Sequence, residues 1–231
     1  MKRTLMTILS FTFLLFQFLS LNLAIAQPRA SGTGSPIGLD DILRGIEERY
    51  AGSTFTARFD QNSTLAAMDI TDTASGKVFV KHPGKMRWEY EKPETQIIIT
   101  NGIDLWVYRP LDRQVMVGKA PNLFGEGKGV GFISDIRQIR KSFSVSLEAA
   151  RAKDSWALKL IPKKSHPDVV EIHLIVEPET FLVTQIVTRN AYKDETRIAL
   201  SGYQFGLHLN ESLFTFIIPK HVDVLQIDED R

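Results

Sequence analysis

The stretch "QIIITNGIDLWVYR", residues 96–109, decides the fold class of this chain. Two apolar runs flank Asn101-Gly102, and this dipeptide is the strongest short signal for a two-residue hairpin turn, which needs positive φ at both positions. A turn of that length would place Thr100 opposite Ile103. The stretch therefore predicts an antiparallel hairpin near the middle of a β-rich chain.

Both faces of this hairpin are apolar. One face carries Ile98, Ile103, Leu105 and Val107, and the other carries Ile97, Ile99, Trp106 and Tyr108. A sheet with one solvated face would alternate apolar and polar residues along each strand. We therefore expect the hairpin to be covered on both sides, by helices, by a second sheet or by a bound apolar ligand.

Alternating apolar residues continue on both sides of the hairpin and predict an extended antiparallel sheet. Further strands are expected at about 54–60, 76–82, 85–91, 113–118, 142–149, 155–162, 168–177, 181–190, 194–206 and 213–218. Apolar residues at helical spacing predict an amphipathic helix that begins at Leu39 and ends near Gly52, and "FISDIRQIR" (132–140) reads as a short helix. The pattern predicts a mainly β fold, with a sheet curled around its own interior and helices over one side or opening.

The strand "HPGKMRWEY" (82–90) raises the question of function. Met86, Trp88 and Tyr90 point to one side of the strand, and charged residues point to the other. The three apolar residues are either ordinary core or one wall of a cavity for an apolar ligand. His82, just before the turn, is correspondingly either a catalytic group or an edge residue of that wall.

The N-terminus carries the signature of an export signal. Lys2 and Arg3 precede an uncharged apolar run from Leu5 to Leu23, and Ala24-Ile25-Ala26 is a cleavage box. The alternative is an uncleaved anchor helix, because the run approaches spanning length. We expect residues 1–26 to be a cleaved signal peptide, 27–37 a flexible leader, 38–227 a single β-domain and 228–231 a polar tail.

Charge and cysteine content narrow the function classes. The 28 basic residues less Lys2 and Arg3 leave 26 in the exported chain, against 27 acidic residues, so its net charge is about −1. This balance argues against nucleic acid as a partner, because phosphate binding needs an excess of positive charge. The chain has no cysteine, and Gln27 stands where a bacterial lipoprotein has its acylated cysteine. We expect an exported protein without a lipid anchor.

Few residues suggest catalysis or a metal site. "GEGKGVG" (125–131) lacks the spacing of a phosphate-binding loop, and no G-x-S-x-G nucleophile motif is present. Glu171 and His173 share one side of a strand and are the best local metal pair, but a solvated strand face explains them more simply. We expect no cofactor, no metal and no enzymatic activity. A carboxylate pair acting as in glycoside hydrolysis stays open, because sequence alone does not reveal one.

Several motifs, taken in order, resemble the outer-membrane lipoprotein carrier protein family, LolA. They lie in "TFTARFDQ" (54–61), "GKVFVKHPGKMRWEYEKPETQIIITNGIDLWVYRPLDRQV" (76–115) and "FTFIIPKHVDV" (214–224). Five features follow one another in these segments: F-x-Q, a basic residue before proline, R-W, a hairpin leading to L-W-x-Y, and F-x-F-x-x-P. Each is weak alone, and the combination is specific. The resemblance spans most of residues 38–224 and is weakest in 120–210.

The resemblance implies an incomplete antiparallel β-barrel, or half-barrel, that encloses an apolar cavity covered by short α-helices. It implies a periplasmic chaperone that binds lipoprotein acyl chains, uses no cofactor and works as a monomer. Such a carrier receives acylated lipoproteins from an inner-membrane ABC-type lipoprotein-releasing transporter and passes them to an outer-membrane lipoprotein receptor. The alternative on the same fold is a periplasmic protein that binds another amphiphile, or senses lipoproteins, without transporting them.

The resemblance also suggests which residues carry the function. The expected acyl-binding residues are Phe59, Met86, Trp88, Tyr90, Ile98 and Leu105. His82 is the expected lid-gating residue, because it stands where the family usually has an arginine that holds the lid through hydrogen bonds to lid backbone. Histidine has fewer donors than arginine and is mostly neutral near pH 7, so lid gating is expected to differ from the family's pattern.

Overall fold

The computed structural model describes residues 37–120, 137–148, 155–165 and 167–227. These residues belong to a unit that runs from Ile37 to Arg231. The expected signal peptide, nearly all of the expected leader, the glycine-rich segment at 121–131 and the polar tail lie outside the described residues. Within the described ranges, no helix has both the length and the apolar character needed to cross a membrane.

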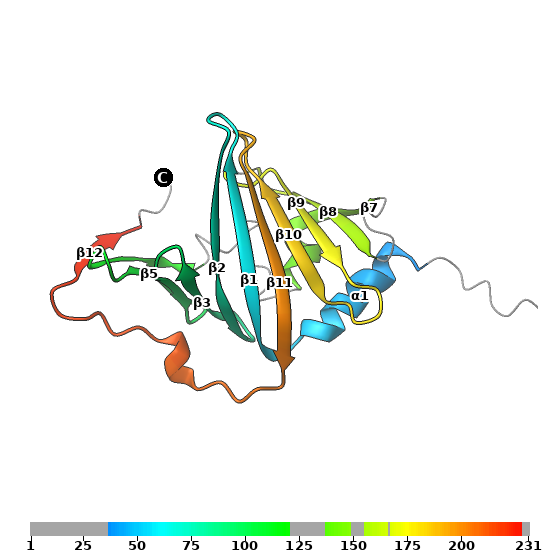
Figure 1. Ribbon diagram of the computed structural model, residues 1–231. Coiled ribbons are helices and arrows are strands. Elements are labelled where there is room, and N and C mark those ends of the chain that lie inside the picture. Colours follow the sequence, from blue (N-terminus) through cyan, green and yellow to red (C-terminus); the bar gives the residue numbers. More distant parts are fainter. Residues whose placement is uncertain (1–36, 121–136, 149–154, 166, 228–231) are drawn as a thin grey trace, which may run out of the picture. The chain divides into compact units, whose positions relative to one another are not determined.

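Most of the described chain forms one large sheet (Figure 1). In chain order the elements are α1 (Leu39–Tyr50), β1 (Thr54–Leu65), β2 (Ile70–Lys81), β3 (Lys85–Lys92), β4 (Gln96–Thr100), β5 (Asp104–Arg109), β6 (Gln114–Lys119), α3 (Gln138–Ser142), β7 (Phe143–Glu148), β8 (Trp156–Pro162), β9 (Glu171–Val176), β10 (Val183–Arg189), β11 (Glu195–Phe205), the 3-10 helix η2 (Glu211–Phe214) and β12 (Asp223–Gln226). The strand order is β12-β6-β5-β4-β3-β2-β1-β11-β10-β9-β8-β7. All neighbours are antiparallel except β12, which runs parallel to β6. The predicted mainly β fold, with an open antiparallel sheet, is confirmed.

The β1–β2 hairpin is longer than the sequence pattern predicts. Both strands have 12 residues, and their pairing continues from Thr54 opposite Lys81 to Leu65 opposite Ile70. The far half is polar, so apolar alternation does not reveal it. Side-chain hydroxyl groups form hydrogen bonds across this half of the hairpin, as between Thr64 Oγ1 and Thr71 Oγ1 at 2.8 Å. In Figure 1 this hairpin extends well past the end of β3.

The β4–β5 hairpin forms, but its predicted register is wrong. Thr100 pairs with Leu105 rather than with Ile103, so the connection is two residues longer than a two-residue turn. The side chain of Asn101 explains the difference, because its Oδ1 accepts from the amides of Ile103 and Asp104 at 2.9 and 2.7 Å. Such an Asx turn replaces the tight turn. Because the shift is an even number of residues, every strand side chain keeps its predicted face.

Two faces of the sheet are distinguished below. The inner face carries Phe59 and Trp88, and the outer face carries the side chains that alternate with them. Helix α1 contributes Ile42, Leu43, Ile46 and Tyr50 to the same buried cluster as the inner face. The hydroxyl of Tyr50 also accepts from the amide of Val183 at 3.0 Å, which joins the end of α1 to β10. The amphipathic helix was predicted, and its packing partner is the inner face.

The outer face of β2–β6 is covered by residues 206–222, here called the strap, which leads from β11 to β12 (Figure 1). Phe214 is buried, and the ring of Phe216 lies 5.1 Å from that of Tyr108. Lys81 and Arg87 donate to carbonyl oxygens of the strap at Leu209 and Leu213, at 3.2 and 3.3 Å. The predicted strand at 213–218 is therefore wrong. A segment without a strand covers the second apolar face of the hairpin.

Candidate ligand-binding site

The register brings the six expected acyl-binding residues together on the inner face. They are Phe59 of β1, Met86, Trp88 and Tyr90 of β3, Ile98 of β4 and Leu105 of β5, and this set is called the apolar wall. Trp88 lies opposite Ile98, and Met86 opposite Thr100, which in turn lies opposite Leu105. Side chains opposite each other in paired strands point to the same face. The wall thus crosses neighbouring strands without a change of face.

The centre of the wall is an aromatic group seated on a glycine. The ring of Phe59 lies 4.8 Å from that of Trp88 and 4.9 Å from that of Tyr90, both in edge-to-face arrangements. Gly76 of β2 lies opposite both Phe59 and Tyr90. A Cβ there would meet the carbonyl oxygen of Glu89 at 1.9 Å and the Phe59 ring at 2.9 Å. Glycine at this position therefore makes room for the rings.

The wall is closed in this structure. Phe59, Met86, Trp88 and Leu105 are each no more than 2% exposed, whereas Tyr90 and Ile98 are partly buried. A ligand can reach these side chains only if the groups that cover them move. Nε1 of Trp88 is enclosed with them and has no hydrogen-bond partner among the described residues. A buried donor without an acceptor is costly, and a ligand oxygen would satisfy it.

The wall ends in a row of neutral polar side chains, here called the neutral belt. Tyr90 donates from its hydroxyl to Oε1 of Gln61 at 3.0 Å, and Nε2 of Gln61 donates to Oγ of Ser63 at 3.0 Å. Ser63 Oγ lies 3.3 Å from Thr196 Oγ1, so the belt crosses β3, β1 and β11. Burial raises the pKa of Tyr90 to about 12, which keeps the phenol neutral at physiological pH.

A cavity of about 270 Å³ opens beside the belt. Gln61, Tyr90 and Gln96 line it from the inner face, and the β3–β4 and β5–β6 connections complete it. The lining residues that are charged at neutral pH are Glu94, Arg109 and Asp112. Arg109 and Asp112 lie 3.4 Å apart as an exposed ion pair. The wall therefore adjoins a polar recess that carries more negative than positive charge.

His82 lies at the other end of β3 from Tyr90. It is the residue after β2, and its backbone amide donates to the carbonyl oxygen of Ser53 at 3.3 Å, three residues beyond the end of α1. The hydrogen bond of His82 therefore joins the β2–β3 turn to the connection between α1 and β1. His82 is thus outside the apolar wall but beside the element that would have to move.

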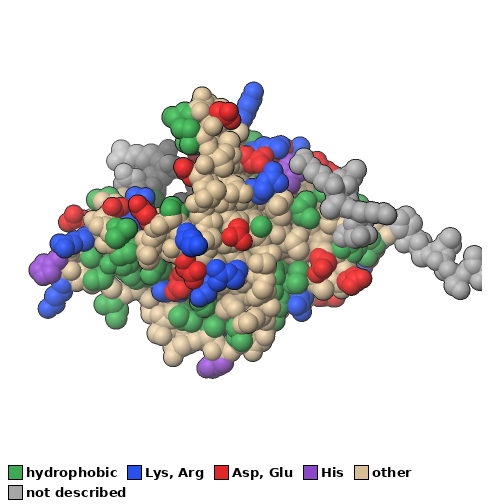
Figure 2. Space-filling model, in the orientation of Figure 1, with side chains coloured by type: hydrophobic (Ala, Val, Ile, Leu, Met, Phe, Trp, Pro, Cys, Tyr) green, Lys and Arg blue, Asp and Glu red, His purple; other side chains and the backbone are tan. Residues whose placement is uncertain are grey.

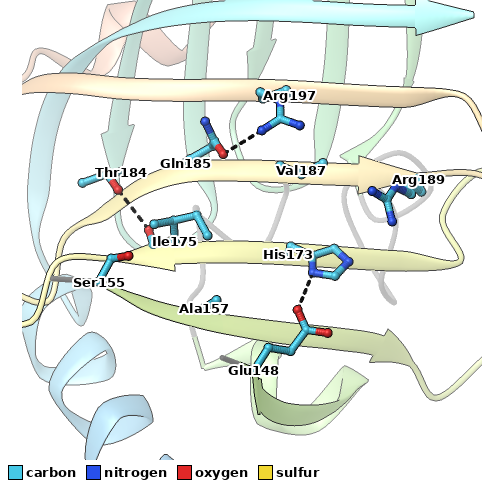
Figure 3. A pocket seen from close by; sticks show the side chains of 10 residues that line it. All are labelled: Glu148, Ser155, Ala157, His173, Ile175, Thr184, Gln185, Val187, Arg189 and Arg197. Atoms are coloured by element: carbon cyan, nitrogen blue, oxygen red, sulfur yellow. Dashed lines mark hydrogen bonds and ion pairs between the residues drawn. The ribbon is translucent and has the colours of Figure 1, made fainter. Parts of the chain in front are cut away.

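The outer face of β7–β11 holds a second cavity, of about 330 Å³, with Glu148, His173, Arg189 and Arg197 among its lining residues (Figure 3). Nδ1 of His173 lies 3.0 Å from Oε2 of Glu148, and Figure 3 shows the two side chains facing each other. Glu171, two residues before His173, binds Lys159 and Arg189 at 2.7 Å each. The hydrogen bond from Lys159 is the main cause that lowers the pKa of Glu171 to about 2.

Glu171 and His173, the pair weighed above as a metal site, are thus part of an ion-pair network. The described residues contain no group of three or more His, Cys, Asp or Glu side chains placed to hold a metal ion. Basic and acidic side chains are interspersed on the face seen in Figure 2. This pattern is that of a solvated sheet face.

Comparison with known proteins identifies relatives of the chain. Residues 51–217 match the family model described as "Outer membrane lipoprotein carrier protein LolA". The chain is 27% identical to the outer-membrane lipoprotein carrier protein of Chromobacterium violaceum, over 86% of this chain and 94% of that protein. It is 26% identical to the protein of the same name from Neisseria meningitidis serogroup B, over 91% and 96% of the two chains. A crystal structure of an uncharacterized conserved protein from Thermus thermophilus has the same fold, with a TM-score of 0.54 and 13% identity, over 81% of this chain and 98% of that chain.

Sequence reasoning named the six wall residues as acyl-binding, which stays a prediction, and did not name Gln61, Ser63 and Thr196 of the belt. Gln61 and Ser63 follow Phe55, Ala57 and Phe59 at a spacing of two, so they lie on the same face. The change along this face of β1, from apolar to neutral polar side chains, was the sequence signal that could have indicated the belt. Thr196 lies 133 positions from Ser63, and only the pairing of β1 with β11 brings it into the belt.

Proposed function

Because the chain belongs to the outer membrane lipoprotein carrier (LolA) family, we propose that it is a periplasmic chaperone for lipoproteins. It binds the acyl chains of lipoproteins released from the inner membrane and carries them to the outer membrane. The observation that carries this proposal is the apolar wall, with its aromatic centre and its polar end. The role involves binding and release, and no covalent step.

The size of the hydrophobic effect explains why such a carrier is needed. Burial of each CH₂ group of an acyl chain contributes about 0.8 kcal/mol, so one long chain costs roughly 10 kcal/mol to expose to water. A lipoprotein with several chains cannot cross an aqueous compartment unaided. A wall built from Phe59, Trp88 and Ile98 offers the chains an apolar environment in a protein that itself moves through water.

Release needs a wall that is not uniformly apolar. Trp88 and Tyr90 each bring a polar atom to an apolar surface, as amphipathic aromatic residues do. The chains would therefore bind less tightly than in a bilayer, which favours delivery. Partners follow from this role: an inner-membrane ABC-type transporter supplies the acylated lipoprotein, and an outer-membrane receptor accepts it.

The proposal also assigns an opening motion. Ligand entry requires α1 to move away from the inner face, because its residues Ile42 and Ile46 are fully buried in the common core. His82 stands where the β2–β3 turn joins the connection after α1. We assign His82 to control of this motion, as the residue that replaces the family's arginine.

A transfer assay tests the proposal. Inner-membrane vesicles that contain the transporter and an acylated lipoprotein are mixed with the exported chain and ATP, and the supernatant is examined for a soluble one-to-one complex. The control is the same lipoprotein with its acylated cysteine replaced by serine. We expect a complex only with the acylated form. If the acylated lipoprotein stays in the vesicles, or if the unacylated form binds equally, the chain is not an acyl-chain carrier.

A further inference from the structure

We propose that the polar end of the apolar wall selects the chemical linkage that carries the acyl chains. It accepts the neutral ester and amide groups of a glyceryl-linked, acylated chain end and disfavours the phosphodiester headgroup of a phospholipid. This inference rests on the proposed function. A carrier needs such selection because phospholipids bring similar acyl chains, so the apolar wall cannot distinguish the two ligands.

The neutral belt is ordered before any ligand binds. Tyr90, Gln61, Ser63 and Thr196 are joined by hydrogen bonds of 3.0, 3.0 and 3.3 Å across three strands. Their hydroxyl and amide groups can reorient to donate to carbonyl oxygens, and none carries a charge at neutral pH. A preorganised neutral surface suits ester and amide groups, because binding neither leaves a charge unpaired nor requires the side chains to be ordered first.

Trp88, two residues before Tyr90 on the same face of β3, supplies a donor. Its Nε1 is enclosed, with no partner in the part of the chain that the structure describes, and its ring packs on Phe59, two residues before Gln61 on the same face. An indole N–H can only donate. The matching ligand group is therefore an acceptor such as the amide carbonyl of the N-acylated cysteine, which a phospholipid lacks. An alkyl chain alone would leave this donor unsatisfied.

The recess beside the belt carries charge of the wrong sign for a phosphate. Its lining residues that are charged at neutral pH are Glu94, Arg109 and Asp112, and Arg109 is already paired with Asp112 at 3.4 Å. A phosphodiester would bring a further negative charge to this recess. Like charges repel, and the repulsion at these exposed groups is screened by water and salt. A neutral linkage avoids this repulsion.

The test uses two ligands with the same acyl chains and different linkages. One is a dioctanoylglyceryl thioether of N-acetylcysteine amide, and the other is dioctanoyl phosphatidylglycerol. Both are titrated against the full exported chain by displacement of a fluorescent fatty acid. We expect the neutral ligand to bind about tenfold more tightly, from one or two hydrogen bonds and the absence of charge repulsion.

One set of variants tests the belt and Trp88, and a second set tests the charges of the recess. Gln61→Leu and Trp88→Phe should each weaken the neutral ligand by about two- to tenfold, more than they weaken phosphatidylglycerol. The double variant Glu94→Lys with Asp112→Lys should raise the affinity for phosphatidylglycerol, and added salt should reduce the gain. The matched control is Glu179→Lys, an exposed charge change in the β9–β10 turn, which should alter neither affinity.

The outcomes separate this inference from the proposed function. If both ligands bind equally and the lysine variants change nothing, the selection is overturned while the carrier role stands. If phosphatidylglycerol binds better than the neutral ligand, the selection is also overturned. If neither ligand displaces the fatty acid, or no fatty acid binds, the carrier role and the selection both fail.

Discussion

Gly45 lies in the middle of α1, where glycine weakens a helix by about 1 kcal/mol relative to alanine. Packing explains its presence. A Cβ at this position would lie 2.2 to 2.6 Å from atoms of the Phe181 ring. The ring of Phe181 is in turn 5.3 Å from that of Trp156. Gly45 therefore lets α1 approach the aromatic pair closely, and this approach sets how the helix lies on the inner face.

Gly45→Ala should destabilise the protein in spite of the better helix propensity. Pushing the Phe181 ring aside costs about 1–3 kcal/mol, which exceeds the gain in propensity. The free energy of unfolding in urea measures the difference. The double variant Gly45→Ala with Phe181→Ala is the control and should lose less than the two single changes together. A gain in stability for Gly45→Ala alone would show that the ring does not limit the helix.

His82→Arg tests the proposed role of His82 in lid gating. Arginine offers five donors in a fixed fork, whereas a neutral histidine offers one. We expect the arginine variant to hold the covering elements more firmly and to take up a fluorescent fatty acid about three- to tenfold more slowly. Stopped-flow fluorescence measures the rate. His208→Arg, at an exposed position, is the control. An unchanged uptake rate in His82→Arg would remove His82 from the gating role.

At the scale of elements, ion pairs of Arg140 hold the exposed side of α1 to α3, and this contact is called the latch. Arg140 of α3 binds Oδ1 of Asp40 at 2.8 Å and Oε1 of Glu47 at 2.7 Å. Its guanidinium also donates to the carbonyl oxygen of Asp40 at 3.1 Å. One side chain thus contacts two turns of the covering helix. The buried face of α1 supplies stability, and this latch supplies a contact that can break without exposing the core.

Arg140→Gln should therefore speed ligand uptake with little loss of stability. Exposed ion pairs contribute about 1 kcal/mol or less each, which corresponds to a change in rate of up to about fivefold. Stopped-flow uptake of a fluorescent fatty acid gives the rate, and urea unfolding gives the stability. The control is Arg44→Gln, whose ion pair with Asp41 lies within α1. Equal rates for both variants would show that the latch does not limit opening.

At the scale of the molecule, the two halves of the outer face are protected differently. The strap covers β2–β6 and is held by Glu211, which binds Lys81 at 2.7 Å and Lys85 at 2.6 Å. The β8–β11 half instead carries the ion pairs around Glu171. Hydrogen bonds from Lys81 and Lys85 lower the pKa of Glu211 to about 2, and the hydrogen bond from Lys159 is the main cause of the same shift at Glu171.

These shifts predict acid sensitivity in one pH range. A carboxyl whose pKa falls from 4.5 to about 2 on folding stabilises the protein above pH 4.5, and this contribution is lost as the pH falls towards 2. Glu171→Gln should lower the stability at pH 6 by about 1–2 kcal/mol and reduce the further loss between pH 4.5 and 2. Urea midpoints across this range measure both effects. The exposed control Glu179→Gln should behave as the original chain, and an unreduced acid loss in Glu171→Gln would contradict the assignment.

Local patterns determined the elements and the faces of their side chains. The spacing of Leu39 to Tyr50 predicted α1, and alternation predicted most of the strands, because both periods follow from backbone geometry. Alternation also sufficed to bring Met86, Trp88 and Tyr90 to one face. The register error at Asn101 did not disturb this, since a shift of two residues leaves faces unchanged.

Contacts between distant segments were decided only by the tertiary structure. The sequence by itself determined a mainly β chain with an apolar face and the motifs of a carrier family. It did not reveal that Phe214 and Phe216 cover the outer face, or that Thr196 completes a belt with Ser63. Both depend on residues far apart in the chain, and no local period encodes their pairing. The same reason explains Gly45 and the Nε1 of Trp88, whose roles depend on neighbours supplied by other elements.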